Sequence, residues 1–216
     1  MGTRWFVFLR VGLLLLGAGN SPAQNPAPAG EWKPASESDG VTIYSRPRPG
    51  SSLREFKAIG LIDAPAQVVW NVTSDHDAYT SFMPYTVECR VLKREGNLFY
   101  LYQRISPLIV RDRDYTLRVV ENSWRAGGGT AYSTQWTAAN ELGPPPKKGV
   151  LRVERCDGSW VIEPEARGKT RATYTIFTDT GGNLPAWVAN AASSIGVRQI
   201  FHAVRRQVKA VKYWKE

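Results

Sequence analysis

The sequence predicts an α+β protein in which a curved antiparallel sheet of about nine strands grips a long C-terminal helix over an internal apolar cavity. Three observations lead to this prediction. Strand-like segments follow one another through short turns, which favours antiparallel pairing. Apolar residues recur at helical spacing near the end of the chain, and this apolar face must cover the sheet. The chain has 216 residues, 43% of them hydrophobic, which suits one domain with a sizeable core.

The first residues have the features of a secretory signal peptide. Two arginines precede a short apolar run, residues 11–19, and Ser21-Pro22-Ala23 places small residues where a signal peptidase reads them. The run is too short to span a bilayer, and the alternative is an uncleaved anchor. We therefore expect a periplasmic or secreted protein. The expected division is a signal peptide at residues 1–23, a flexible lead-in at 24–31 and one domain at 32–216.

Two helical segments are expected after the second strand. In residues 63–71, Asp63 can cap a helix, Pro65 suits its first turn, and the residues that follow form an apolar face. A shorter helical piece is expected over residues 75–82, and Pro84 ends it.

Nine segments have the composition and alternation of strands, separated by turn residues such as Asp157-Gly158 and Arg167-Gly168. The expected strands are residues 41–46, 54–62, 87–94, 98–105, 114–121, 130–137, 150–156, 159–163 and 170–178.

The C-terminal helix is expected to begin after Asn183, which can cap it, with Pro185 in its first turn, and to continue to Val211. Its second half carries large apolar residues at helical spacing. Its first half carries a stripe of smaller residues, which leaves room beneath it for a cavity. The residues of this first-half stripe are Leu184, Val188, Ala191, Ala192 and Ile195.

Three local segments on these elements resemble the START domain family of lipid-binding proteins, within the helix-grip superfamily. They are Val110-Arg111-Asp112-Arg113-Asp114-Tyr115, Pro146-Lys147-Lys148-Gly149-Val150-Leu151-Arg152 and Gly182-Asn183-Leu184-Pro185. The resemblance implies an apolar tunnel that holds one lipid, with the last helix and a neighbouring loop as its lid. It also leaves an alternative, since relatives in the superfamily include aromatase/cyclase-like enzymes.

The resemblance also implies a polar anchor. Arg113 matches an arginine that turns toward a polar ligand group in several family members; the alternative is an ion pair with Asp112, Asp114 or a cross-strand acid. Gln103 stands where some sterol binders place an acid. The expected ligand-binding residues are Arg113, Gln103, Tyr115, Trp136, Leu184, Val188, Ala191, Ala192 and Ile195. The expected lid loop, which is otherwise a long connection, contains Leu142, Pro144, Pro145 and Pro146.

Catalytic and metal-binding signatures are not found in the sequence, which has only two histidines, His76 and His202. We therefore expect a carrier without a cofactor or metal rather than an enzyme.

Without residues 1–23 the net charge falls from +9 to +7, because two arginines and no acid are removed. The cations are scattered, which favours transient contact with a membrane surface over nucleic acid; the alternative is a soluble basic protein without such contact. We expect a monomer, and the sequence leaves open whether Cys89 and Cys156 pair.

Overall fold

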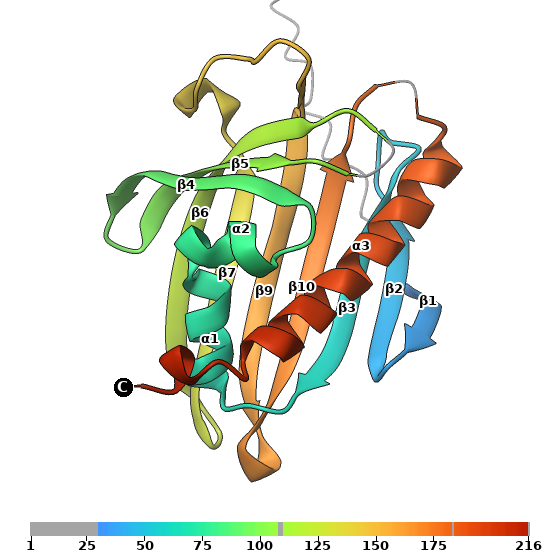
Figure 1. Ribbon diagram of the computed structural model, residues 1–216. Helices are drawn as coiled ribbons and strands as arrows, with labels where there is room; N and C mark the ends of the chain where they lie inside the picture. Colours follow the sequence, from blue (N-terminus) through green and yellow to red (C-terminus); the bar gives the residue numbers. More distant parts are fainter. Residues whose placement is uncertain (1–29, 108–109, 183, 216) are drawn as a thin grey trace, which may run out of the picture.

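The computed structural model describes residues 30–107, 110–182 and 184–215. It shows one strongly curved sheet of ten strands in the order β1-β2-β3-β10-β9-β7-β6-β5-β4, with β8 paired to β6 beside this path. The long helix α3 crosses the concave face of the sheet, and the short helices α1 and α2 lie on the same side (Figure 1). This arrangement confirms the predicted α+β helix-grip fold.

The strands are β1 Lys33–Ser38, β2 Val41–Pro47, β3 Arg54–Ile62, β4 Thr86–Glu95, β5 Leu98–Ile105, β6 Arg113–Ala126, β7 Gly129–Ala138, β8 Leu151–Arg152, β9 Arg155–Glu165 and β10 Lys169–Asp179. The α-helices are α1 Ala66–Ser74, α2 Tyr79–Phe82 and α3 Ala186–Gln207, and the short 3₁₀ turns are η1 His76–Ala78, η2 Asn140–Leu142, η3 Ala166–Gly168 and η4 Val211–Trp214. The strand pairs along the main path are antiparallel, whereas β8 pairs with β6 in parallel.

The main core lies under the second half of α3. Phe201 and Val204 are fully buried there, and the Phe201 ring packs on Trp160 of β9 with ring centroids 5.4 Å apart. Gly60 of β3 makes this approach possible, since a Cβ at that position would lie only 2.9 Å from Cε1 of Phe201. The large apolar stripe of the sequence therefore clamps this half of the helix to the sheet.

The expected turn at Asp157-Gly158 is wrong, because both residues lie inside one continuous strand, β9. Glycine serves a steric purpose here. A Cβ at Gly158 would lie 2.4 Å from Cζ2 of Trp136 and 2.5 Å from the backbone oxygen of Thr175. The strand expected over residues 150–156 is divided, since Leu151–Arg152 forms β8 while Arg155 and Cys156 already belong to β9.

Edge strand β1 was not expected, and it places the first helix after the third strand rather than the second. Helix α1 begins at Ala66 with Pro65 as its N-cap, so Asp63 is not the cap that the sequence suggested. The expected short helical piece before Pro84 is present as η1 and α2.

Helix α3 is shorter than expected. Pro185 is its N-cap residue rather than part of its first turn, and the expected cap Asn183 lies outside the described residues. The helix ends at Gln207, since Ala210 has extended backbone angles and the chain then forms η4 in place of a helix to Val211.

Two further observations concern membrane-spanning segments and the cysteines. In the part of the chain that the structure describes, no helix combines the length and apolar character needed to cross a membrane. The expected signal peptide, residues 1–23, lies outside that part. Cys89 and Cys156 are both free thiols.

Candidate functional site

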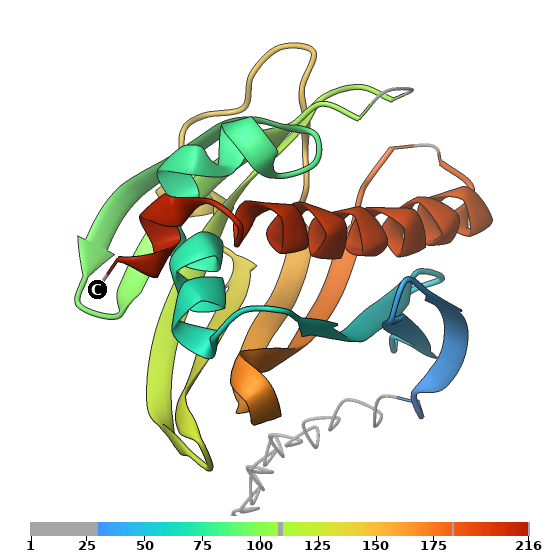
Figure 2. The same cartoon turned by 60° about the horizontal axis from the view of Figure 1, so that its bottom comes forward.

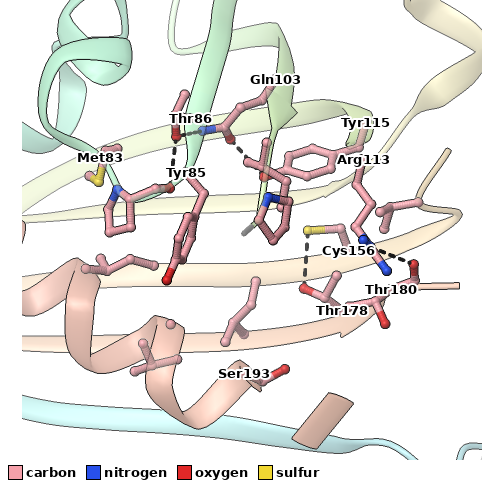
Figure 3. Close-up of a pocket in the computed structure, with 18 of the residues that line it drawn as sticks. Met83, Tyr85, Thr86, Gln103, Arg113, Tyr115, Cys156, Thr178, Thr180 and Ser193 are labelled. Atoms are coloured by element: carbon pink, nitrogen blue, oxygen red, sulfur yellow. Dashed lines mark hydrogen bonds between the residues drawn. The ribbon is translucent and has the colours of Figure 1, made fainter. Parts of the chain in front are cut away.

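A cavity of about 520 Å³ lies between the first half of α3 and the concave face of the sheet. Its walls come from alternate residues of β5, β6, β7, β9 and β10, because successive side chains of a strand point to opposite faces. On β6, for example, Arg113, Tyr115, Leu117 and Val119 face the cavity. Figure 3 shows polar groups gathered around Arg113 and Tyr115 at one end of this space.

The structure brings most of the expected ligand-binding residues together around this one cavity. Ala191 is the exception, because the turn of the helix directs it to solvent while Ala192 faces inward. The expected residues that line the cavity are Arg113, Gln103, Tyr115, Trp136, Leu184, Val188, Ala192 and Ile195.

Arg113 is a buried guanidinium, only 5% exposed. Its Nε donates to the backbone oxygen of Thr180 at 3.3 Å, and its Nη1 donates to that of Arg111 at 2.6 Å. Burial lowers the pKa of Arg113 from its usual value, but a guanidinium keeps its charge at neutral pH. Backbone oxygens therefore hold the side chain in place, and its charge faces the cavity.

The alternative of an ion pair at Arg113 is not what the structure shows. Asp112 accepts from Arg104 Nη1 at 2.7 Å, and Asp114 accepts from Arg152 Nε at 2.8 Å. Among residues 30–107, 110–182 and 184–215, no carboxylate lies within ion-pair distance of Arg113. Asp112 and Asp114 therefore form ion pairs with other cations rather than with Arg113.

A short hydrogen-bond network fixes the polar wall beside Arg113. The Tyr115 hydroxyl donates to Oε1 of Gln103 at 3.0 Å, and Nε2 of Gln103 donates to Oγ1 of Thr86 at 3.1 Å. Burial raises the pKa of Tyr115 well above its usual value, so the phenol stays protonated. Gln103 is therefore oriented by the protein itself, with one amide hydrogen left for a ligand.

Arg113 gives the cavity a positive charge. Among the lining side chains that the structure describes, none is aspartate, glutamate or lysine. His76 lines the other end, where burial lowers its pKa to about 4, so it is neutral at pH 7. A negatively charged ligand group is the natural complement of such a wall.

The expected lid loop, which contains Leu142 and the three prolines at 144–146 and is called the three-proline loop below, does not lie over the cavity. The expectation that it acts as a lid is therefore corrected. Tyr102 of β5 and Thr116 of β6 alternate with cavity-lining residues and so point to the convex face. The loop packs on that convex face, where Asn140 accepts from the Thr116 backbone N–H at 2.9 Å. Arg152 Nη2 donates to the Pro144 oxygen at 3.1 Å. None of Leu142, Pro144, Pro145 and Pro146 lines the cavity.

Sequence reasoning also missed part of the wall. Leu101, Leu117 and Val119 could have been found from the period-two alternation of β5 and β6. Cys156 and Tyr174 could not be assigned to the site before the order of β9 and β10 in the sheet was known. Burial raises the pKa of the Cys156 thiol to about 12, so it remains protonated.

The sequence model of the family described as "Polyketide cyclase / dehydrase and lipid transport" matches residues 62–205, more than half of the chain. The chain belongs to this family. An uncharacterized protein of Pseudomonas aeruginosa is 29% identical to it over 175 residues, which are 81% of this chain and 82% of that one. The phosphatidylcholine transfer protein of Rattus norvegicus is 27% identical over 178 residues, with the same shares covered.

A solved structure points the same way. The crystal structure of a fragment of the STAR-related lipid transfer protein from Xanthomonas axonopodis has a TM-score of 0.73 and 28% sequence identity. The match covers 83% of this chain and 99% of that fragment. The expected START-like membership within the family is therefore confirmed, and lipid binding is supported at the level of the family.

Proposed function

We propose that this START-like protein binds one lipid in the cavity under α3 and carries it between membranes. The observation that carries the proposal is an apolar cavity that holds a single arginine, Arg113, for which the described chain provides no carboxylate. A volume of about 520 Å³ lies within the range of sites that enclose one small ligand.

Apolar burial supplies most of the affinity in this proposal. Removing roughly 500 Å² of apolar ligand surface from water contributes on the order of 12 kcal/mol at ~25 cal/mol per Å², before the costs of association and ordering. One or two polar contacts are then enough to orient the ligand. Arg113 provides the charged contact, and the spare amide hydrogen of Gln103 provides a neutral one.

The positive charge favours a lipid whose anionic group is not accompanied by a quaternary ammonium. The cluster of rings that could hold an ammonium, Trp136, Trp160 and Tyr174, has centroid distances of 5.7 and 4.6 Å. Trp136 pairs with Val119, which lies roughly 20 Å from Arg113 along β6 at ~3.3 Å per residue. A single phosphocholine headgroup is too small to engage both sites, and the cavity volume suits a single-chain lipid, so we favour a fatty acid.

Native mass spectrometry tests the function. After incubation with vesicles that contain equal amounts of a fatty acid and phosphatidylcholine, we expect a one-to-one complex enriched in the fatty acid, with the lipid chemically intact. The enrichment follows from the charge of Arg113, since a charged hydrogen bond contributes more than a neutral one. Release of a changed ligand in proportion to protein would instead support the cyclase alternative, and equal capture of both lipids would contradict the anionic preference.

Membrane contact is proposed at the exposed stripe beside the cavity. Trp187 is 75% exposed, and Ile195, which also borders the cavity, is 54% exposed. With Ala191 they lie along one face of α3, next to Val188 and Ala192, which line the cavity. An exposed apolar face of this kind suits the interface between headgroups and acyl chains.

We predict that Trp187→Ala slows lipid transfer between vesicles about threefold to tenfold, because part of the indole's burial energy is lost at the membrane. Vesicle-to-vesicle transfer of a fluorescent lipid measures this rate. The matched control is Trp124→Ala, an exposed tryptophan on β6 outside the cavity wall, which should leave the rate unchanged. Equal slowing by both substitutions would show that the α3 stripe has no special role.

Export belongs to the same proposal. The expected signal peptide would direct the carrier to the periplasm or the medium, where lipids must cross water between membranes.

A further inference from the structure

A second hollow, of about 550 Å³, lies at the other end of α3, away from the lipid cavity. Its wall includes His202, Arg205 and Arg206 from α3 and Lys209 just after the helix, together with the exposed apolar side chain of Leu61. Figure 2 shows that α3 extends along the molecule, with the C-terminus near one of its ends. Arg206, which lines this hollow, follows Trp187 by 19 residues of α3, a separation of roughly 28 Å at 1.5 Å per residue.

Two of these cations have no partner in the described chain. Arg205 is committed to structure, since it donates to the backbone oxygens of Asp39, Gly40 and Leu61. Arg206 and Lys209 are exposed, and the described residues offer them neither an ion pair nor a side-chain hydrogen bond. One acid, Asp63, reaches the hollow, and its carboxylate lies 3.9 Å from Nζ of Lys169.

An exposed aromatic ring stands beside these cations on a rigid support. Trp214 is 52% exposed, and its Nε1 donates to the Val208 oxygen at 2.7 Å, which holds the indole in place. Its neighbour Tyr213 is buried, and the Tyr213 hydroxyl donates to Asp75 at 2.9 Å while its backbone oxygen accepts from Asn71 at 3.0 Å. The chain end is thus tied to α1 and is preorganised.

The surface formed here, which we call the basic end, combines exposed cations with exposed apolar side chains. Its cations are Arg206, Lys209 and Lys215, together with Lys212, which pairs with Asp75 at 2.7 Å, and its apolar members are Leu61, Val211 and Trp214.

We propose that the basic end docks on the surface of an anionic lipid bilayer, as a second membrane contact distinct from the α3 stripe at the cavity. The charges match a negatively charged leaflet, where each lysine or arginine near the surface contributes about 1 kcal/mol. The exposed indole and aliphatic side chains match the boundary between headgroups and acyl chains, where tryptophan is favoured. A site for a small free anion would not need these exposed apolar groups.

The test is cosedimentation of the purified protein with vesicles of phosphatidylcholine alone and of phosphatidylcholine mixed with phosphatidylglycerol. Removing both free cations in Arg206→Gln/Lys209→Gln should weaken binding to the mixed vesicles on the order of thirtyfold, roughly fivefold for each charge. The matched control removes two exposed cations from the convex face, Arg118→Gln/Arg171→Gln, and should change binding less than threefold.

The wild-type preference for mixed vesicles should also fall as salt is raised from low to physiological concentration, because surface charges are screened. Equal losses in the two double variants would overturn the proposal, since net charge alone would then explain binding. Tighter binding to a short DNA duplex than to mixed vesicles would also overturn it, as would inorganic phosphate displacing the vesicles. These outcomes are independent of which lipid the cavity holds.

Discussion

Replacing Arg113 with methionine should weaken the binding of an anionic lipid by about tenfold to a hundredfold. A hydrogen bond to a charged group contributes about 1.5–3 kcal/mol, and in the proposed complex the ligand's anionic group meets a guanidinium that is removed from water. Methionine retains the unbranched apolar stem and so changes the shape of the wall little. Titration of the protein with a fatty acid, followed by native mass spectrometry, measures the change.

The folded protein without ligand should tolerate this change. Arg113 gives up two hydrogen bonds to backbone oxygens, but the substitution also removes a buried charge that no carboxylate neutralises. The thermal midpoint should therefore stay nearly unchanged. Arg111→Met, at an exposed neighbouring position, is the control and should leave affinity intact. A fall in stability with unchanged relative affinity would show that Arg113 is only structural.

The second large effect is expected at Asp114, on the opposite face of the same strand. Its carboxylate is 1% exposed and accepts from Arg152 Nε at 2.8 Å, from Arg152 Nη2 at 3.1 Å and from the Tyr102 hydroxyl at 3.1 Å. Asp114→Ala leaves the Arg152 guanidinium largely buried without its counter-charge. Breaking a buried pair in this way costs about 3–5 kcal/mol of unfolding free energy.

Urea denaturation of the wild type and the variant measures that loss. The double variant Asp114→Ala/Arg152→Met should recover a substantial part of it, because removing both partners leaves no unpaired buried charge. The three-proline loop, which Arg152 holds through the Pro144 oxygen, should become more sensitive to protease in the single variant. A loss below about 1 kcal/mol would contradict the assignment of this pair as the anchor of the loop.

Local pattern predicted the elements well where one face of a strand or helix is buried. In β6 and β7 the apolar residues of the alternating pattern face the interior, and the large apolar stripe of α3 is the face that contacts the core. Edge strand β1 has almost no buried face and contains Pro34, so its sequence shows no apolar alternation from which a strand could be predicted. The Asp157-Gly158 pattern predicts a turn, but Gly158 is needed there because Trp136 approaches it closely. This contact comes from another strand, so local sequence does not reveal it.

The site residues also fall into those that local pattern predicts and those that only long-range contacts determine. The small residues of α3 and the inward residues of β6 were predictable, but which of Ala191 and Ala192 faces the cavity depends on the rotation of the helix. The face of the sheet that the three-proline loop covers is set by long-range contacts such as Asn140 with Thr116. The choice between an ion pair and a free guanidinium at Arg113 depends on Arg104 and Arg152, which occupy both neighbouring acids.

Strand alternation places Arg113 and Asp114, adjacent in the chain, on opposite sides of the sheet. In the proposed function, the preference for a ligand and the stability of the fold therefore depend on neighbouring residues that share no partner. A designer could exchange the cavity arginine for a neutral or acidic group, to seek sterols or cationic amphiphiles, without disturbing the fastening on the outer side. Selectivity in this scaffold is therefore open to redesign one position at a time.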